Sequence, residues 1–189
     1  MYQMAEQTSL QHILFDPCGW IHPGRFVLPK MLNSAGCQSV LNTLLIRHYK
    51  LSVDSFKIKV GSITETMVEN WPILPHVVFL LACKQYRAPL LYQGEFRNME
   101  KYVQDFCSHP SDNEQPIRLC HPVQLDTLMA SGLQILMGFN EHIPQSLIQR
   151  IPLLFDERHL QKNSYHFLST VSYIDFKLAI QYTKNHYLP

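Results

Sequence analysis

Prolines bound three short apolar segments of this chain, and they restrict its fold more than any other feature. The segments read FDPCGWIHP at residues 15–23, WPILP at 71–75 and IPLLF at 151–155. A proline inside a helix removes a backbone hydrogen bond and clashes with the preceding turn, and it biases the residue before it toward extended geometry. Because Pro29 follows Pro17 and Pro23, we expect residues 15–29 to form a stiff, irregular stretch.

Between these segments, apolar residues recur with the spacing of amphipathic helices. This periodicity predicts helices at residues 37–49, 62–70, 77–87, 96–107, 123–138, 144–150 and 171–182. Asn33 and Ser34 are candidate caps for the first, and Ser62 with Glu65 has the spacing of a capping box. Pro75 suits the start of the third helix and Pro89 its end. Strict alternation at residues 56–60 (FKIKV) predicts at most a short strand.

The fold prediction is mainly α, with a single compact helical domain and Pro-rich connecting turns. We expect about six or seven helices from the periodic segments. The domain covers residues 13–189, after a polar N-terminal lead-in at residues 1–12, and residues 108–119 are the best internal loop. The side chains that we expect in its core are Phe15, Leu80, Leu81 and those of residues 153–155.

Composition limits the classes of function. Of the 189 residues, 46% are hydrophobic and only 16% are charged, so a sparsely charged surface is available to partners. A net charge of +1 argues against a nucleic-acid-binding protein. The first ten residues lack a signal-peptide pattern, and no apolar run reaches the ~18 residues of a membrane-spanning helix. We expect a cytoplasmic protein whose five cysteines are free thiols.

Two groups of cysteine and histidine residues could carry chemistry. Cys18 and His22 are the residue types of a thiol nucleophile and its base, but they are sequence neighbours without a cysteine-protease signature. A second group has zinc-ligand residue types at spacings that zinc sites rarely use: Cys107, His109, Cys120 and His121. The sequence also lacks a glycine-rich phosphate loop and a nucleophile elbow. We therefore expect no enzymatic activity, no cofactor and no metal.

The proline-bounded segments have two interpretations. They either pack into the core and end helices, or they dock a partner, and both can hold for different faces of one turn. Rigid turns are cheap to order on binding, and Trp and Arg are enriched at interface hot spots.

Four groups of residues, spread over residues 13–184, resemble the signatures of a known family. They are ILFDP (13–17), IHP (21–23) and Arg25; LP (74–75), VFLL (78–81), Cys83 and Arg87; NE (140–141), Pro144, SL (146–147) and QRIPLLF (149–155); and LA (178–179), QY (181–182) and Lys184. In this order and spacing they look like the OrgA/MxiK family of bacterial type III secretion. Residues 52–69 and 108–119 match poorly, and Ala82 replaces a small, Gly-like residue.

The resemblance implies a mainly helical, non-enzymatic adaptor of the injectisome's sorting platform, at the cytoplasmic face of the inner membrane and required for effector secretion. One implied partner is the cytoplasmic, forkhead-associated-like domain of the inner-membrane ring protein (PrgH/MxiG type). The other is the pod protein of the SpaO type, which leads to the ATPase complex. The alternative is a secretion chaperone or another helical partner-binding protein of the same apparatus. The interface residues that we predict are Asp16, Trp20, His22, Arg25, Arg87 and Arg150.

Overall fold

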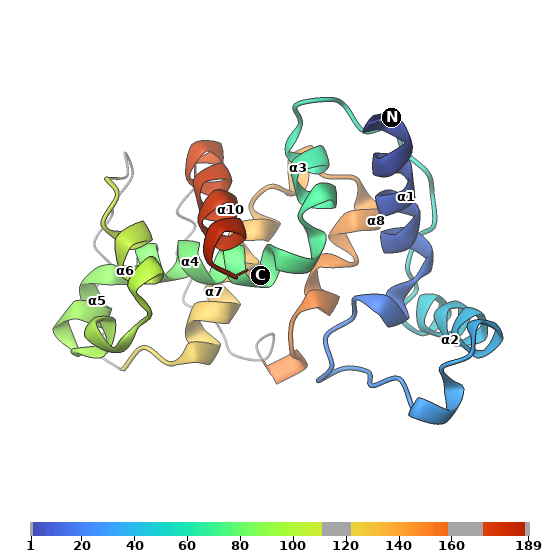
Figure 1. Ribbon diagram of the computed structural model, residues 1–189, viewed down its shortest axis with the longest axis horizontal. Helices are drawn as coiled ribbons and strands as arrows, with labels where there is room; N and C mark the ends of the chain where they lie inside the picture. The colour runs from blue at the N-terminus through green and yellow to red at the C-terminus, as the bar shows by residue number, and fades with distance from the viewer. Residues whose placement is uncertain (1, 111–121, 159–171, 188–189) are drawn as a thin grey trace. The chain divides into compact units, whose positions relative to one another are not determined.

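The computed structural model describes residues 2–110, 122–158 and 172–187. The chain divides into two compact units, which we describe separately (Figure 1). Unit 1 comprises Met1–Pro72 and Phe139–Glu157, and unit 2 comprises Ile73–Gly138 and Arg158–Pro189. The described residues form nine α-helices and no strand. The mainly α prediction is therefore confirmed, with more helices than expected, while the extent of a single domain stays a prediction.

Unit 1 is built from helices joined by short 3₁₀ turns. Its α-helices are α1 (Tyr2–Phe15), α2 (Ala35–His48), α3 (Ile63–Glu69) and α8 (Gln145–Ile148), and its 3₁₀ turns include η1 (Pro17–Gly19), η2 (Lys30–Leu32), η5 (Asn140–His142) and η6 (Ile151–Leu154). Helix α1 packs against α3, η1 and α2. It begins within the stretch expected to be a lead-in, and η1 follows it at Pro17, as the prolines predict.

The two helix starts that the sequence predicted in unit 1 are confirmed by their caps. The Ser34 Oγ accepts a hydrogen bond from the Cys37 N–H at 3.3 Å, so α2 begins after Ser34. The Ser62 Oγ accepts from the Glu65 N–H at 3.2 Å, while the Glu65 carboxylate accepts from the Gly61 N–H at 2.6 Å. Side chains thus satisfy N–H groups at the starts of α2 and α3 that no helical carbonyl reaches.

The short strand allowed for residues 56–60 does not form. Figure 1 shows the segment between α2 and α3 running without a helical turn, and within the described chain it pairs with no other strand. Alternation is a sign of a half-buried extended segment, but a strand also needs a neighbour to pair with. The segment has the side-chain pattern and lacks the neighbour.

A small apolar cluster fills unit 1 next to the first proline-bounded turn. It consists of Ile21, Leu51 and Leu153, with Trp20, Phe26, Ile46 and Tyr49 packed against it. The core prediction for residues 153–155 is confirmed. The prediction for Phe15 is wrong, because its side chain is 50% exposed. Ile13 and Leu14 occupy the buried side of α1, and the 100° step per residue of a helix turns the next side chain outward.

Unit 2 is arranged around one apolar helix, α4 (Leu74–Gln85), which packs against α7 (Leu125–Met137), α10 (Tyr173–Tyr187) and α6 (Lys101–Cys107). Leu80 and Leu81 are buried, as predicted. Pro75 lies in the first turn of α4, where a missing N–H costs nothing.

Two predicted boundaries in unit 2 are wrong. Pro89 does not stop the chain's helical path, because a new helix, α5 (Arg87–Tyr92), begins directly after α4. Pro89 falls in the first turn of α5, where its lack of an N–H is tolerated. The helix expected at residues 96–107 is a 3₁₀ turn, η4 (Glu95–Asn98), followed by α6.

No single helix in the described ranges is long and apolar enough to cross a membrane. On length and composition alone, one bent pair passes the same test, Ile63–Glu69 with Trp71–Gln85.

Candidate functional site

The candidate site is the N-terminal turn, by which we mean residues 16–26. Its first part is η1, which Pro17 starts and in which the Pro17 carbonyl accepts from the N–H groups of Trp20 and Ile21 at 3.2 and 2.9 Å. The next N–H, that of His22, donates to the Leu153 carbonyl at 2.9 Å. The first proline-bounded segment is therefore fixed on the third, although about 130 residues separate them.

Asp16 ties the start of this turn to two helices. Its Oδ1 accepts a hydrogen bond from the Asn42 side-chain amide of α2 at 2.8 Å, and its Oδ2 lies 3.0 Å from His12 Nδ1 of α1. The Asn42 side-chain oxygen in turn accepts from the Cys18 N–H at 2.9 Å. Asp16 was predicted as an interface residue, and in this chain its carboxylate is engaged in holding the turn.

Trp20 packs on the other indole of the chain. The ring centroids of Trp20 and Trp71 lie 5.5 Å apart and their planes meet at 89°, the edge-to-face geometry that aromatic rings favour. Trp71 is buried and Trp20 is half-buried. One part of the Trp20 side chain therefore belongs to the core of unit 1, and the rest is open to solvent.

His22 and Arg25 fix the end of the turn. The His22 Nδ1 accepts from the Gly24 N–H at 3.0 Å, and the Arg25 Nε donates to the Phe155 carbonyl at 2.6 Å. A Cβ on Gly24 would lie 2.7 Å from a carboxylate oxygen of Asp156, so any larger residue here would displace that side chain. Both predicted interface side chains are half-buried and each makes a structural hydrogen bond.

The thiol chemistry considered for Cys18 gains no support from its surroundings. Burial, followed by the nearby Asp16 carboxylate, raises the pKa of Cys18. A raised pKa keeps the thiol protonated, whereas a nucleophile or a metal ligand needs the thiolate. The geometry favours a packing role for Cys18.

The second Cys/His group is only partly described. Burial raises the pKa of Cys107 to about 12, against the smaller opposing effects of Arg87 and Lys84. The His109 Nε2 lies 3.3 Å from the Tyr182 hydroxyl. Cys120 and His121 lie outside the described residues, within which no group of three or more metal-ligating side chains occurs. The zinc alternative therefore stays untested.

The Arg150 side chain donates four hydrogen bonds within unit 1. Its Nε donates to the Ile13 carbonyl at 3.2 Å, and one terminal nitrogen donates to Leu14 at 2.8 Å. The other terminal nitrogen donates to the carbonyls of Ser52 and Ser146, both at 2.7 Å. Burial lowers the pKa of Arg150 to about 10. Four backbone carbonyls from three distant segments thus share one guanidinium.

This placement corrects the prediction that Arg150 offers a surface to a partner. The side chain is 0% exposed, and two of its acceptors belong to the last turn of α1, whose carbonyls have no helical donor. Arg150 also places a positive charge at the negative end of the α1 dipole. The local sequence carries little signal of this burial, because the neighbours of Arg150 are one polar residue, Gln149, and one apolar residue, Ile151.

Arg87 belongs to unit 2, whereas the other predicted site residues belong to unit 1. It is half-buried at the start of α5, and its Nε is buried without a hydrogen-bond partner among the residues that the structure describes. The structure therefore brings Asp16, Trp20, His22 and Arg25 together in one turn of unit 1 and leaves Arg87 elsewhere.

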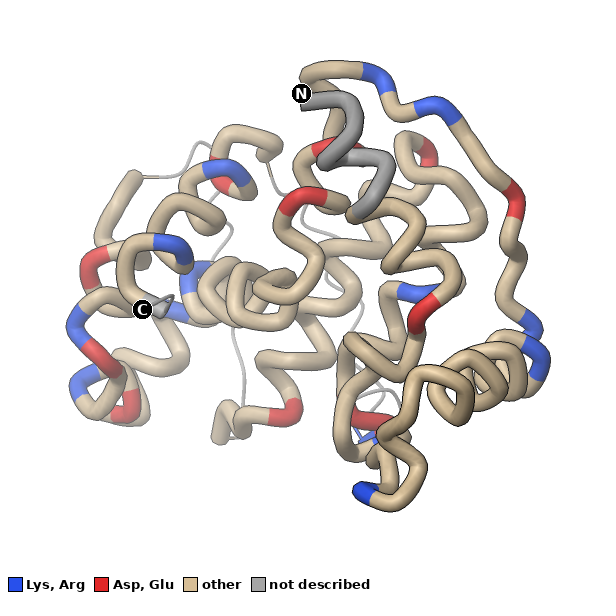
Figure 2. The backbone as a smooth tube through the Cα atoms, turned by 45° about the vertical axis from the view of Figure 1, so that its right-hand side comes forward, with Lys and Arg blue, Asp and Glu red and all other residues tan. Residues whose placement is uncertain are grey.

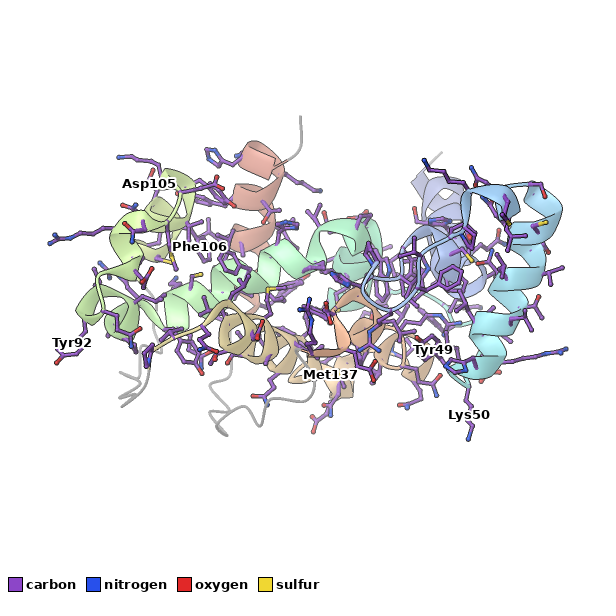
Figure 3. The ribbon with its side chains drawn as sticks, turned by 90° about the horizontal axis from the view of Figure 1, so that it is seen from below. Tyr49, Lys50, Tyr92, Asp105, Phe106 and Met137 are labelled. Atoms are coloured by element: carbon purple, nitrogen blue, oxygen red, sulfur yellow. The ribbon has the colours of Figure 1, made fainter. Side chains whose placement is uncertain are left out.

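The sequence reasoning missed large apolar side chains that lie on the surface. In unit 1 they include Val40 and Leu44, one turn apart on α2, at 60% and 53% exposure. Only Arg47 is fully charged along α2, and Figure 2 shows this helix almost wholly in the colour of uncharged residues. In unit 2, Tyr92 is 93% exposed and points outward from α5 (Figure 3). The helical spacing of Val40 and Leu44 suggested the buried face of an amphipathic helix.

Comparisons with known proteins agree with the family signatures found within residues 13–184 of the sequence. The family model described as "Bacterial type III secretion apparatus protein (OrgA_MxiK)" matches residues 10–185. The "Oxygen-regulated invasion protein OrgA" of Salmonella typhimurium (strain SL1344) is 31% identical over 147 residues, which are 77% of this chain and 73% of the relative. "Protein MxiK" of Shigella flexneri is 25% identical over 176 residues, 93% and 88% of the two chains. No solved structure matches. This chain belongs to the OrgA/MxiK family of bacterial type III secretion apparatus proteins.

Proposed function

We propose that this protein is a non-enzymatic adaptor of the type III secretion apparatus that works at the cytoplasmic face of the inner membrane. One surface binds the forkhead-associated-like cytoplasmic domain of the inner-membrane ring protein (PrgH/MxiG type). Another binds the pod protein of the SpaO type and, through it, reaches the ATPase complex. The protein is then required for effector secretion as a connector.

The observation that carries this proposal is that each compact unit has its own exposed apolar side chains. An adaptor needs two separate binding surfaces, and the division into two units provides two separate supports for them. The exposed large apolar residues of unit 1 include Val27, Met31, Val40 and Leu44, and those of unit 2 include Leu91, Tyr92, Leu125 and Ile174.

The α2 face supports a protein partner more strongly than scattered residues do. Single exposed apolar side chains are normal on any protein surface. Val40 and Leu44 lie on one side of a helix, and the α2 segment contains no acidic residue. A helix side that is apolar and nearly uncharged is typical of the centre of a protein interface.

The experiment is a co-purification of this chain with the ring protein's cytoplasmic domain and with the pod protein. Val40→Asp with Leu44→Asp disrupts the exposed apolar side of α2 in unit 1, and Leu91→Asp with Tyr92→Asp disrupts the exposed apolar residues of α5 in unit 2. Each pair should weaken one partner by about tenfold or more, because a charge enters an apolar contact, and leave the other partner bound. Gln181→Asp with Asn185→Asp adds the same charge at exposed polar positions of α10 and should retain both.

The proposal fails if the native chain binds neither partner, or if both surface variants retain both. Dimerisation with binding to a secreted substrate, measured by light scattering, would instead support the secretion chaperone.

A further inference from the structure

Residues 55–60, between α2 and α3, form a segment whose backbone N–H and C=O groups make almost no hydrogen bonds within the described chain. No N–H group of residues 55–60 donates a hydrogen bond to any part of the described chain. Among the carbonyls of the segment, only that of Lys59 accepts one, from the Ser62 N–H at 3.1 Å. Figures 1 and 2 show this stretch of the trace without a helical turn. Open N–H and C=O groups along an extended segment are a template for pairing with another strand.

The side chains of the segment alternate as those of a strand do. Phe56 and Ile58 are half-buried, whereas Lys57 and Lys59 are exposed. This is the period of two that places one face of a strand on the protein and the other in solvent. The segment therefore has the side-chain alternation and the open backbone groups of an edge strand that lacks its neighbour.

A hollow beside the segment carries a positive charge. Its volume is about 560 Å³, and its walls include Lys57, Lys59, Thr64, Glu141 and His142. Neither lysine forms an ion pair within the described ranges. The lining includes two lysines and one carboxylate, that of Glu141, so the net charge of the walls is positive.

We infer that residues 55–60 accept an extended, acidic segment of a partner protein as an added β-strand. Backbone pairing of this kind supplies affinity, and the side chains beside it supply specificity. Glutamate or aspartate at alternate positions of the partner would lie opposite Lys57 and Lys59, where opposite charges stabilise a strand pair. This inference rests on the proposed function, for which it specifies how one partner is recognised.

A second copy of this chain is a poor candidate for the strand that pairs with residues 55–60. In the antiparallel register centred on Ile58, Lys57 of one copy lies opposite Lys59 of the other. Like charges directly opposite each other destabilise a strand pair, so the charge pattern favours an acidic partner over self-association.

The test uses the full chain and two synthetic heptapeptides, TEVEVET and TKVKVKT. The acidic peptide should slow hydrogen exchange at residues 55–60 and bind about tenfold more tightly than the basic peptide, a preference that salt weakens. Lys57→Glu with Lys59→Glu should reverse the preference. The control, Lys101→Glu with Lys184→Glu, makes the same charge change at exposed positions of unit 2 and should retain it.

Two proline variants test whether the backbone carries the pairing. Successive N–H groups of a strand point to opposite edges, so Ser55→Pro removes a donor from one edge and Val60→Pro removes a donor from the other. Both residues are exposed. One variant should bind the acidic peptide about three- to tenfold more weakly, and the other should bind it as the native chain does.

Equal binding of the two peptides, unchanged exchange at residues 55–60, or no effect of either proline would overturn the inference. These outcomes are independent of co-purification with the ring and pod proteins. A chain that binds both proteins while ignoring the peptides retains the adaptor function and loses this mode of recognition.

Discussion

The two units satisfy their backbone hydrogen-bonding groups in different ways. Unit 1 joins two 14-residue helices, α1 and α2, to short helices through several 3₁₀ turns, and the backbone groups of such turns and of helix ends are only partly satisfied within each element. A buried side chain completes them, since Arg150 donates to four carbonyls. Unit 2 consists of α4 and the helices around it, which satisfy most of their own backbone and meet through apolar contacts. Irregular segments can thus be packed tightly where a many-donor side chain is available.

The polar groups inside unit 2 have a different role. Lys84 pairs with Asp175 at 2.8 Å and lies over the Phe106 ring, 5.4 Å from its centroid. The Tyr86 hydroxyl and the Ser131 hydroxyl are 3.0 Å apart. Each of these bonds joins one side chain to another and fixes how the helices meet. In unit 1, by contrast, the Arg150 side chain donates to backbone carbonyls.

The largest expected effect tests the polar centre of unit 1. Arg150→Ala leaves four carbonyls without this donor and should lower the free energy of unfolding of unit 1 by about 3–5 kcal/mol. Arg150→Lys keeps a charge but has no planar fork of donors, so it should recover only part of the loss. Hydrogen exchange of α1 and α4 amides measures the two units separately. Equal loss of exchange protection in both helices would contradict the prediction that Arg150 stabilises unit 1 alone.

The next effect concerns the aromatic pair. Trp20→Ala removes a half-buried indole and its edge-to-face contact with Trp71, and should cost about 3 kcal/mol in urea unfolding. Trp20→Phe keeps a ring at this position and should cost about 1 kcal/mol. If the unfolding curve stays unchanged while a partner is lost, Trp20 belongs to an interface instead.

A pair of glycine variants probes the close packing of unit 2. A Cβ on Gly132 of α7 would lie 2.8 Å from both the Val78 Cγ2 and the Val78 carbonyl oxygen. A backbone oxygen cannot yield as a side chain does, so Gly132→Ala should destabilise unit 2 by about 2 kcal/mol. Gly36→Ala is the control, because its Cβ meets nothing within 4 Å, and it should stabilise α2 by about 0.5–1 kcal/mol. Thermal shifts of the same sign would contradict this account.

A dependence of stability on pH comes from two thiols of unit 2. Burial raises the pKa of Cys83 above its ordinary value of 9.0 and that of Cys107 to about 12. Above pH 9 the unfolded thiols lose protons that the folded thiols keep. Stability should therefore fall as pH rises, by up to about 1.4 kcal/mol per pH unit for each thiol.

The pH range of that measurement follows from Arg150. Its folded pKa of about 10 is lower than its ordinary value of 12.5, so its contribution rises with pH above about 10 and opposes that of the thiols. Urea unfolding between pH 8 and pH 10 therefore avoids the opposing contribution of Arg150. Cys107→Ala should show a shallower fall than the native chain, and equal slopes would exclude a contribution from Cys107.

The sequence predicted the helices of this fold better than its surfaces. Periodicity and caps located α2 and α3, because these signals are local and Ser34 and Ser62 act on neighbouring N–H groups. The end placed at Pro89 was wrong, since the same proline that stops one helix is tolerated in the first turn of the next. Exposure of Phe15 depends on which side of α1 faces the rest of unit 1, which no local pattern determines.

The candidate site was located in part. The first segment was correctly identified as a rigid turn, but its contacts with Asn42 and Leu153 come from distant segments that no spacing rule connects. Arg150 illustrates the same difficulty. Its carbonyl acceptors come from residues 13, 14, 52 and 146, and only the folded chain shows that one guanidinium reaches all of them.

The position of Arg150 along the chain has a consequence for protein synthesis. Helix α1 and the segment at Ser52 leave the ribosome well before residue 150 does. At about 5–20 residues per second, their carbonyls rely on water for several seconds until the guanidinium arrives. Most of unit 2 is translated during that interval. The N-terminal unit can therefore be completed only after most of the other unit has been made, which reverses the usual order in which an N-terminal part folds first.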